Sequence, residues 1–190
     1  MVIIGDSYST QANPWHRRVF ETVMATGEVV LTVDAIGGTG YVNGQPDRIN
    51  FLERLHDLSP GTDLVVFFGS LNDVHHRADL VGRTAAAAFE LAKTTAPGVQ
   101  LVVIGPPTVV PDRFDDMSAI RDELARAAAT AGAEFIDPIG EGWFAGDDVR
   151  FISDDGVHPT PAGQDYMADK LRDRLLRSVE AASRAGTDRA

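Results

Sequence analysis

Apolar residues along the chain form two kinds of pattern: short continuous runs, and positions spaced as on one face of a helix. The continuous runs predict five strands, over residues 2–5, 28–35, 63–68, 100–104 and 133–137. The segments between and after them predict helices over 14–26, 49–58, 77–95, 115–131 and 161–182. Gly27 ends the first helix, and Pro161 stands in the first turn of the last one.

Strands and helices alternate from one end of the chain to the other. Because the strands are apolar throughout rather than at every second position, we expect both faces of each strand to be buried. This pattern predicts an α/β protein, a three-layer α/β/α sandwich in which helices cover both faces of a five-stranded parallel sheet. We expect a single domain over residues 1–182 and a frayed polar tail over 183–190.

Polar motifs lie where the predicted strands end, at the edge where open parallel sheets bind ligands. Three of them follow strands, and the fourth precedes the last helix. They are Gly5-Asp6-Ser7, Gly37-Gly38, Gly69-Ser70-Leu71-Asn72-Asp73 and Asp155-Gly156-Val157-His158. The motifs are far apart in the sequence, but the predicted topology brings them to one edge of the sheet. Their convergence predicts a functional site there.

Ser7, His158 and Asp155 have the chemistry of an activated nucleophile. A serine hydroxyl is a poor nucleophile unless a base such as histidine takes its proton, and that base needs a carboxylate to orient it. Asp155 lies three residues before His158, so the two side chains can meet within one turn. Two other interpretations stay open: Ser7 could be only a helix cap, and Asp154 could be the partner of His158.

The same motifs contain hydrogen-bond donors for the oxyanion that forms during acyl transfer. The amides of Ser7 and Gly38 and the side-chain amide of Asn72 could supply three such donors. A glycine lets the backbone approach a substrate closely, and an asparagine amide donates without carrying a charge. Gly37 and Gly40 are alternatives to Gly38 in the same loop.

These motifs carry a resemblance to the SGNH hydrolases, the family of GDSL-type esterases and lipases. Gly5-Asp6-Ser7-Tyr8-Ser9 resembles the first block of the family, and Gly38 fits the glycine of the second. Gly69-Ser70-Leu71-Asn72-Asp73 resembles the Gly-x-x-Asn-Asp block, and Asp155-Gly156-Val157-His158-Pro159 resembles the last block. The matches occur in the order of the family and span residues 5–168.

The resemblance implies a flavodoxin-like sheet and an enzyme that uses no metal or cofactor; we expect the strand order 2-1-3-4-5. It implies that Ser7 is the nucleophile, His158 the base, and Asp155 the residue that orients the base. It also implies that Gly38 and Asn72 donate to the oxyanion, together with the Ser7 amide. Members of the family are known as esterases, lipases, thioesterases and carbohydrate deacetylases.

Further residues near the motifs have two interpretations each. Trp15, Trp143 and His75 could line a substrate pocket, although aromatic residues more often pack in a core. His75 and His76, with Asp154, could suggest a metal site, but adjacent histidines point in different directions, so solvent-facing side chains are expected. Asp73 is interpreted as a structural residue that braces its loop through backbone hydrogen bonds.

Charge and composition exclude several classes of function. The formal net charge of −11 and the lack of a basic stripe argue against nucleic-acid binding. The chain has no cysteine, no P-loop motif and no apolar run of the roughly 18 residues that span a bilayer. We expect either a cytoplasmic protein or the mature domain of a longer, exported one; the oligomeric state is left open.

The sequence therefore predicts a serine esterase that hydrolyses carboxylic esters through an acyl-enzyme. We expect a shallow, open cleft, because no insertion is long enough to form a large lid. Such a cleft favours a small-molecule or glycan ester with a short acyl group, such as O-acetyl on a carbohydrate. The alternatives are a lysophospholipase or thioesterase acting on longer chains and, from another class, a non-catalytic binding module with the same fold.

Overall fold

The computed structural model describes residues 1–25, 29–44, 49–69, 71–107 and 114–187 of the chain. Its sheet consists of β1 (Val2–Gly5), β2 (Thr32–Ala35), β3 (Leu64–Phe68), β4 (Gln100–Ile104) and β5 (Glu134–Ile136). The five strands pair in parallel in the order β2-β1-β3-β4-β5. The predicted sheet and its strand order are thus confirmed.

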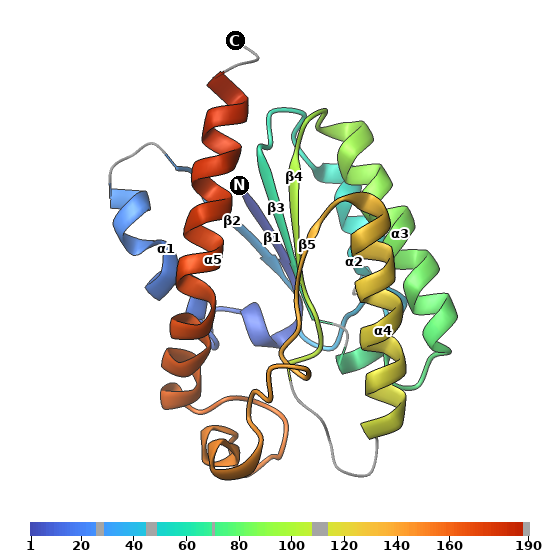
Figure 1. Ribbon diagram of the computed structural model, residues 1–190, viewed down its shortest axis with the longest axis vertical. Coiled ribbons are helices and arrows are strands. Elements are labelled where there is room, and N and C mark those ends of the chain that lie inside the picture. The colour runs from blue at the N-terminus through green and yellow to red at the C-terminus, as the bar shows by residue number, and fades with distance from the viewer. Residues whose placement is uncertain (26–28, 45–48, 70, 108–113, 188–190) are drawn as a thin grey trace.

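Helices cover both faces of the sheet (Figure 1). On one face, α1 (Trp15–Ala25) packs against the long α5 (Pro161–Thr187). The other face carries α2 (Phe51–Arg54), α3 (Ala78–Thr95) and α4 (Phe114–Ala131), with α3 packed against α4. Short 3₁₀ turns occur at Ser7–Ser9, Leu55–Asp57, Leu71–Asp73 and Gly146–Phe151.

Neighbouring residues of β3 show why its whole run is apolar. Side chains of a strand alternate between the two faces of a sheet. Phe67 packs against Phe89 of α3, with 5.1 Å between ring centroids. Phe68 packs instead against Trp15 of α1, at 5.6 Å. All of β3 is buried, so both faces of the sheet contribute to the hydrophobic core.

Three elements differ from their predicted bounds by more than one residue at an end. β2 begins at Thr32 rather than at residue 28, because its neighbour β1 begins with Val2, which pairs with Thr32. The predicted helix over 49–58 is an α-helix only over Phe51–Arg54 and then tightens into a 3₁₀ turn. The last helix continues past residue 182 to Thr187, so residues 183–187 of the predicted tail are helical, and residues 188–190 lie outside the described residues.

Packing explains the longer last helix. Val179 and Ala182 are buried, so one side of the helix is still covered near its end. A helix whose apolar side is packed can extend for another turn even where its composition is polar.

Among the described residues, no helix is both long and apolar enough to cross a membrane.

Candidate active site

Ser7 lies at the carboxyl edge of the sheet, in the 3₁₀ turn that follows β1. Asp6 caps this turn, since its carboxylate accepts a hydrogen bond from the Tyr8 amide at 2.9 Å. The Ser7 carbonyl oxygen accepts hydrogen bonds from Thr10 Oγ1 at 3.2 Å and from Asn13 Nδ2 at 2.6 Å. The cap is therefore Asp6, and the interpretation of Ser7 as only a helix cap is wrong.

Ser7, His158 and Asp155 form a continuous hydrogen-bonded chain. Ser7 Oγ lies 2.9 Å from His158 Nε2, although the two residues are 151 positions apart in the sequence. The other ring nitrogen, His158 Nδ1, lies 2.7 Å from Asp155 Oδ2. With Nδ1 donating its proton to the carboxylate, Nε2 is the tautomeric position that can accept the Ser7 proton.

Hydrogen bonds fix Asp155 as an anion in its own loop. Its Oδ1 atom accepts hydrogen bonds from the His158 amide at 2.9 Å, the Val157 amide at 2.8 Å and Ser153 Oγ at 2.7 Å. These bonds, led by those of the His158 amide and ring, hold the pKa of Asp155 well below its usual range. The structure thus places Asp155, rather than its neighbour Asp154, at the imidazole ring.

A cavity of about 330 Å³ opens directly beside Ser7. Its walls come from all four polar motifs, which the sheet topology brings together as predicted. The lining residues are Asp6, Ser7, Gly37, Gly38, Leu71, Asn72, Val157 and His158. Ser70, which belongs to the third motif, lies outside the described residues. The cavity is small and carries both polar groups and two aliphatic side chains.

The three candidate glycines have different surroundings. Gly38 lines the cavity and has a φ of 78°, in the left-handed region that favours glycine. Gly37 also lines the cavity, and a Cβ atom on it would lie 3.6 Å from the Ser7 Cβ atom. Gly40 is not part of the lining, and a Cβ atom there would lie only 2.6 Å from Asp73 Cγ. Gly40 is therefore needed for the approach of Asp73, while Gly37 and Gly38 face the cavity.

Asn72 presents its side-chain amide at the cavity wall. The Nδ2 atom donates hydrogen bonds to the Thr39 carbonyl oxygen at 2.9 Å and to Asp6 Oδ2 at 3.2 Å. Both hydrogens of the amide therefore have acceptors within the protein. These two contacts fix the orientation of the Asn72 side chain relative to Ser7.

Asp73 braces the neighbouring loop, as the sequence predicted. Its buried carboxylate accepts hydrogen bonds from three consecutive amides, those of residues 41–43, at 2.8–3.0 Å. Asn43 in turn donates from Nδ2 to the Gly38 carbonyl oxygen at 2.7 Å. Asp73 therefore positions, through this loop, the backbone that carries Gly38.

Burial raises the pKa of Asp6 to about 7, and the nearby charge of Asp73 also raises it, although the hydrogen bond from the Tyr8 amide lowers it. Desolvation likewise raises the pKa of Asp73. Both carboxyl groups are buried; Asp6 lines the cavity and contacts both the Ser7 turn and the Asn72 amide.

Arg54 is a residue that the sequence patterns did not single out. Its buried guanidinium donates from Nη1 to the backbone and side-chain oxygens of Asp34, at 2.8 and 2.9 Å, and from Nη2 to the Gly5 carbonyl oxygen at 3.0 Å. It also donates to Thr39 Oγ1 at 3.4 Å. Arg54 thereby joins the ends of β1 and β2 to the glycine-containing loop. The sequence signal that could have identified Arg54 is an isolated arginine within a short predicted amphipathic helix.

The two tryptophans that were candidates for substrate contact lie elsewhere. Trp15 is fully buried between α1 and the sheet, and its Nε1 atom donates to Ser9 Oγ at 3.3 Å. Trp143 is also buried and packs against Tyr166 of α5, with its Nε1 atom 3.1 Å from Glu141 Oε2. Both side chains are buried, and neither residue lines the cavity beside Ser7. Both indoles serve the packing of helices on the sheet.

The histidines after the third motif lie outside the cavity. His75 is exposed and does not line the cavity beside Ser7. His76 lies with Nε2 3.4 Å from Asn43 Oδ1. The described part of the chain contains no cluster of histidine, aspartate and glutamate that could hold a metal ion.

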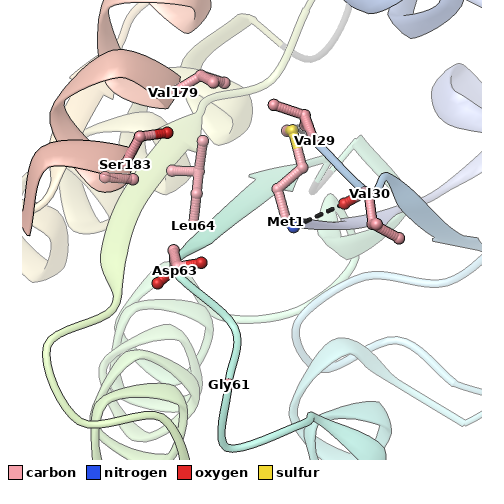
Figure 2. A pocket seen from close by; sticks show the side chains of 9 residues that line it. Met1, Val29, Val30, Gly61, Asp63, Leu64, Val179 and Ser183 are labelled. Carbon is pink, nitrogen blue, oxygen red and sulfur yellow. Dashed lines mark hydrogen bonds between the residues drawn. The ribbon is translucent and has the colours of Figure 1, made fainter. Parts of the chain in front are cut away.

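A second hollow, of about 260 Å³, lies at the opposite edge of the sheet, where the strands begin (Figure 2). Leu64, Val179 and the Met1 side chain face this hollow, and the Met1 amino group donates to the Val30 carbonyl oxygen at 2.8 Å. Ser183 and Asp63 also line it, but its described lining includes no histidine. The hollow therefore lacks a base of the kind that stands beside Ser7.

Comparison with known proteins gives matches over nearly the whole chain. The sequence pattern of the GDSL-like Lipase/Acylhydrolase family matches residues 3–166. A GDSL lipase of Mycobacterium tuberculosis is 38% identical over 185 residues, covering 90% of this chain and 79% of the relative.

Solved structures share the fold at low sequence identity. An acetyl xylan esterase superposes with a TM-score of 0.75 at 18% identity, covering 92% of this chain and 98% of its own. A GDSL-like lipase from Parabacteroides merdae superposes with a TM-score of 0.71 at 16% identity, covering 88% of this chain and 91% of its own.

Proposed function

Since this chain belongs to the GDSL-like lipase/acylhydrolase family and is an ester hydrolase of the SGNH type, we propose that Ser7 is its nucleophile and that it removes short acyl groups from carbohydrate esters. The observation that carries the assignment of Ser7 is the 2.9 Å contact between its Oγ atom and His158 Nε2. This contact is the geometry that general-base activation of a serine requires.

The proposed reaction has two acyl-transfer steps. Ser7 Oγ attacks the ester carbonyl carbon while His158 Nε2 takes the hydroxyl proton, and the Asp155 carboxylate stabilises the resulting imidazolium. The ring then gives this proton to the leaving alcohol, and an acyl-enzyme forms on Ser7. Water, activated by His158, hydrolyses the acyl-enzyme and restores the free hydroxyl. Every proton transfer in this sequence passes through the Nε2 atom of His158.

The oxyanion of each tetrahedral intermediate needs donors on the side of Ser7 away from the leaving group. We assign this role to the amides of Ser7 and Gly38 and to Asn72 Nδ2. The Asn72 amide already has two acceptors, so an oxyanion must compete with Asp6 or with the Thr39 carbonyl for one N–H group. An oxyanion carries more charge than the ester oxygen of the ground state, so this competition favours the transition state.

Two observations support a short acyl group. The cavity beside Ser7 measures only about 330 Å³, and the aliphatic residues in its lining are Leu71 and Val157. One of the similar structures is an acetyl xylan esterase, whose TM-score with this chain is 0.75. An acetyl group fits such a small cavity, whereas a long acyl chain needs an extended apolar channel.

A series of p-nitrophenyl esters from acetate to decanoate, followed by acetylated xylan oligosaccharides, tests this proposal. Within the ester series, we expect kcat/KM to be highest for the acetate. We also expect the enzyme to release acetate from the oligosaccharides. A rise in kcat/KM with chain length would support instead a lysophospholipase or thioesterase. Ser7→Ala should lower kcat by about 10⁴-fold or more with little change in stability, and its folded form should resist labelling by a fluorophosphonate probe.

A further inference from the structure

Tyr8 joins the turn of the nucleophile to the loop of the base. Its side chain is buried, and its hydroxyl donates a hydrogen bond to the Val157 carbonyl oxygen. Tyr8 directly follows Ser7, and Val157 directly precedes His158. Two consecutive residues of the turn therefore contact two consecutive residues of the loop, through the Ser7–His158 and the Tyr8–Val157 hydrogen bonds.

The loop that carries His158 is largely held by bonds within itself. The Ser153 amide donates to the His158 carbonyl oxygen at 2.8 Å, and the Gly156 amide donates to the Ser153 carbonyl oxygen at 2.9 Å. The side chains of Asp155 and His158 are 50% and 39% exposed, so burial does little to fix their position. A loop of this kind keeps its internal shape but needs an external contact to hold its distance from Ser7.

The Tyr8 ring provides a rigid base for that contact. It packs against Phe68 of β3, with 6.0 Å between ring centroids, and its centroid lies 6.1 Å from that of the His158 imidazole. Burial raises the pKa of Tyr8 far above the neutral range, so its hydroxyl stays a donor. Without the Tyr8 hydroxyl, the partly buried Val157 carbonyl oxygen would lose this hydrogen-bond donor, and an unsatisfied buried acceptor costs free energy.

We infer that Tyr8 is a positioning residue for catalysis: by holding the Val157 carbonyl, its hydroxyl sets the distance between His158 Nε2 and Ser7 Oγ. This inference rests on the proposed function, in which His158 is the base. Misplacement of a catalytic group by about 1 Å can lower the rate by about 100-fold. Tyr8 therefore acts on the rate of proton transfer and touches neither the substrate nor the reacting atoms.

Tyr8→Phe removes the hydroxyl and keeps the ring, so it tests the inference directly. We expect kcat on p-nitrophenyl acetate to fall by about 10- to 100-fold and KM to stay within about twofold. The rate of fluorophosphonate labelling at Ser7 should fall by a similar factor. Activity is expressed per folded molecule, with the folded fraction taken from circular dichroism, so that partial unfolding does not imitate the effect.

Tyr41→Phe is the matched control. The Tyr41 ring is also buried, but its hydroxyl has no hydrogen-bond partner among the described residues, so its loss should leave kcat unchanged. If Tyr8→Phe keeps kcat within about twofold of the unmodified protein, the inference is wrong. An equal loss of kcat in both variants would also overturn it, because a general effect on the core would then be responsible.

A double-mutant cycle with His158→Ala separates positioning from a general structural effect. If Tyr8 acts through His158, Tyr8→Phe should not lower the residual activity of His158→Ala any further. A further loss of about 10-fold would overturn the inference, since Tyr8 would then act on the oxyanion donors. Ser7→Ala keeps these outcomes apart from the proposed function itself: if that variant stays active, Ser7 is not the nucleophile, whatever Tyr8 does.

Discussion

Arg54 Nη2 donates a hydrogen bond of 3.0 Å to the carbonyl oxygen of Gly5, the last residue of β1 before the turn that carries Ser7. The same guanidinium pairs with Asp34 at 2.9 Å. A single buried cation therefore holds the ends of two neighbouring strands on which the site is built. An intact buried ion pair adds little to the stability of the fold. Removing one partner is costly, because the buried oxygen atoms that remain lose their hydrogen-bond donor.

We expect Arg54→Met to lower the free energy of unfolding by about 2 kcal/mol or more, since Gly5 and Asp34 lose a shared donor. Chemical denaturation followed by circular dichroism measures this change. Arg83→Ala is the control: Arg83 pairs with Asp79 on an exposed surface, and its loss should leave the denaturation midpoint nearly unchanged. Equal midpoints for the two variants would contradict a structural role of Arg54.

Asp155→Asn should lower kcat on p-nitrophenyl acetate by about 100-fold or more, because an amide cannot stabilise the imidazolium and can favour the wrong tautomer. Asp154→Asn is a matched control in the same loop, and its kcat should stay within about twofold. Steady-state kinetics of the two purified variants distinguishes them. A large loss in Asp154→Asn with none in Asp155→Asn would reverse the assignment.

Gly38→Ala should be more harmful than Gly37→Ala. Gly38 has a φ of 78°, where a Cβ atom costs about 1–2 kcal/mol, and the resulting shift would move its amide away from the oxyanion. A Cβ atom on Gly37 would make an ordinary contact of 3.6 Å with Ser7 Cβ. We expect kcat to fall by about 100-fold for Gly38→Ala and far less for Gly37→Ala. The reverse order would assign the donor to Gly37.

Asp6→Asn should change how stability depends on pH. A carboxyl group with a pKa raised to about 7 stabilises the folded state while protonated, and this contribution is lost as the pH rises through that value. An amide does not ionise. We therefore expect the free energy of unfolding of Asp6→Asn, taken relative to that of the unmodified protein, to be about 3 kcal/mol higher at pH 8 than at pH 5. Urea denaturation at both pH values measures it. A constant difference would mean that Asp6 has an ordinary pKa.

The sequence predicted the sheet well because burial on both faces leaves a direct mark, a continuous apolar run such as that of β3. It also predicted Ser7, Asp155 and His158 as partners, since local motifs carry the chemistry and parallel topology brings strand ends together. Which of the two interpretations of Trp15 holds could not be decided from the sequence, for a long-range reason. Its side chain faces inward because α1 packs it against Phe68, and sequence spacing alone does not reveal which face of that helix is covered.

Residues whose role depends on distant partners were the ones missed. Arg54 acts on Gly5 and Asp34, which lie 49 and 20 positions away. In the sequence, Tyr8 is only one residue of the first motif, although its hydroxyl reaches a residue 149 positions further along the chain. Neither contact leaves a local pattern, because each depends on how the loops beyond the strand ends are packed.

His158 stands at the rim of the cavity: its side chain is 39% exposed, and the cavity beside Ser7 measures about 330 Å³. Under the proposed mechanism, the two halves of an ester meet different constraints. If the acyl group enters this cavity, the acid part must be small, whereas the alcohol part, which would receive its proton from His158 at the rim, can project into bulk water without a limit on its size. A site shaped in this way can act on substituents along an intact polymer, and the chain length of that polymer need not affect turnover.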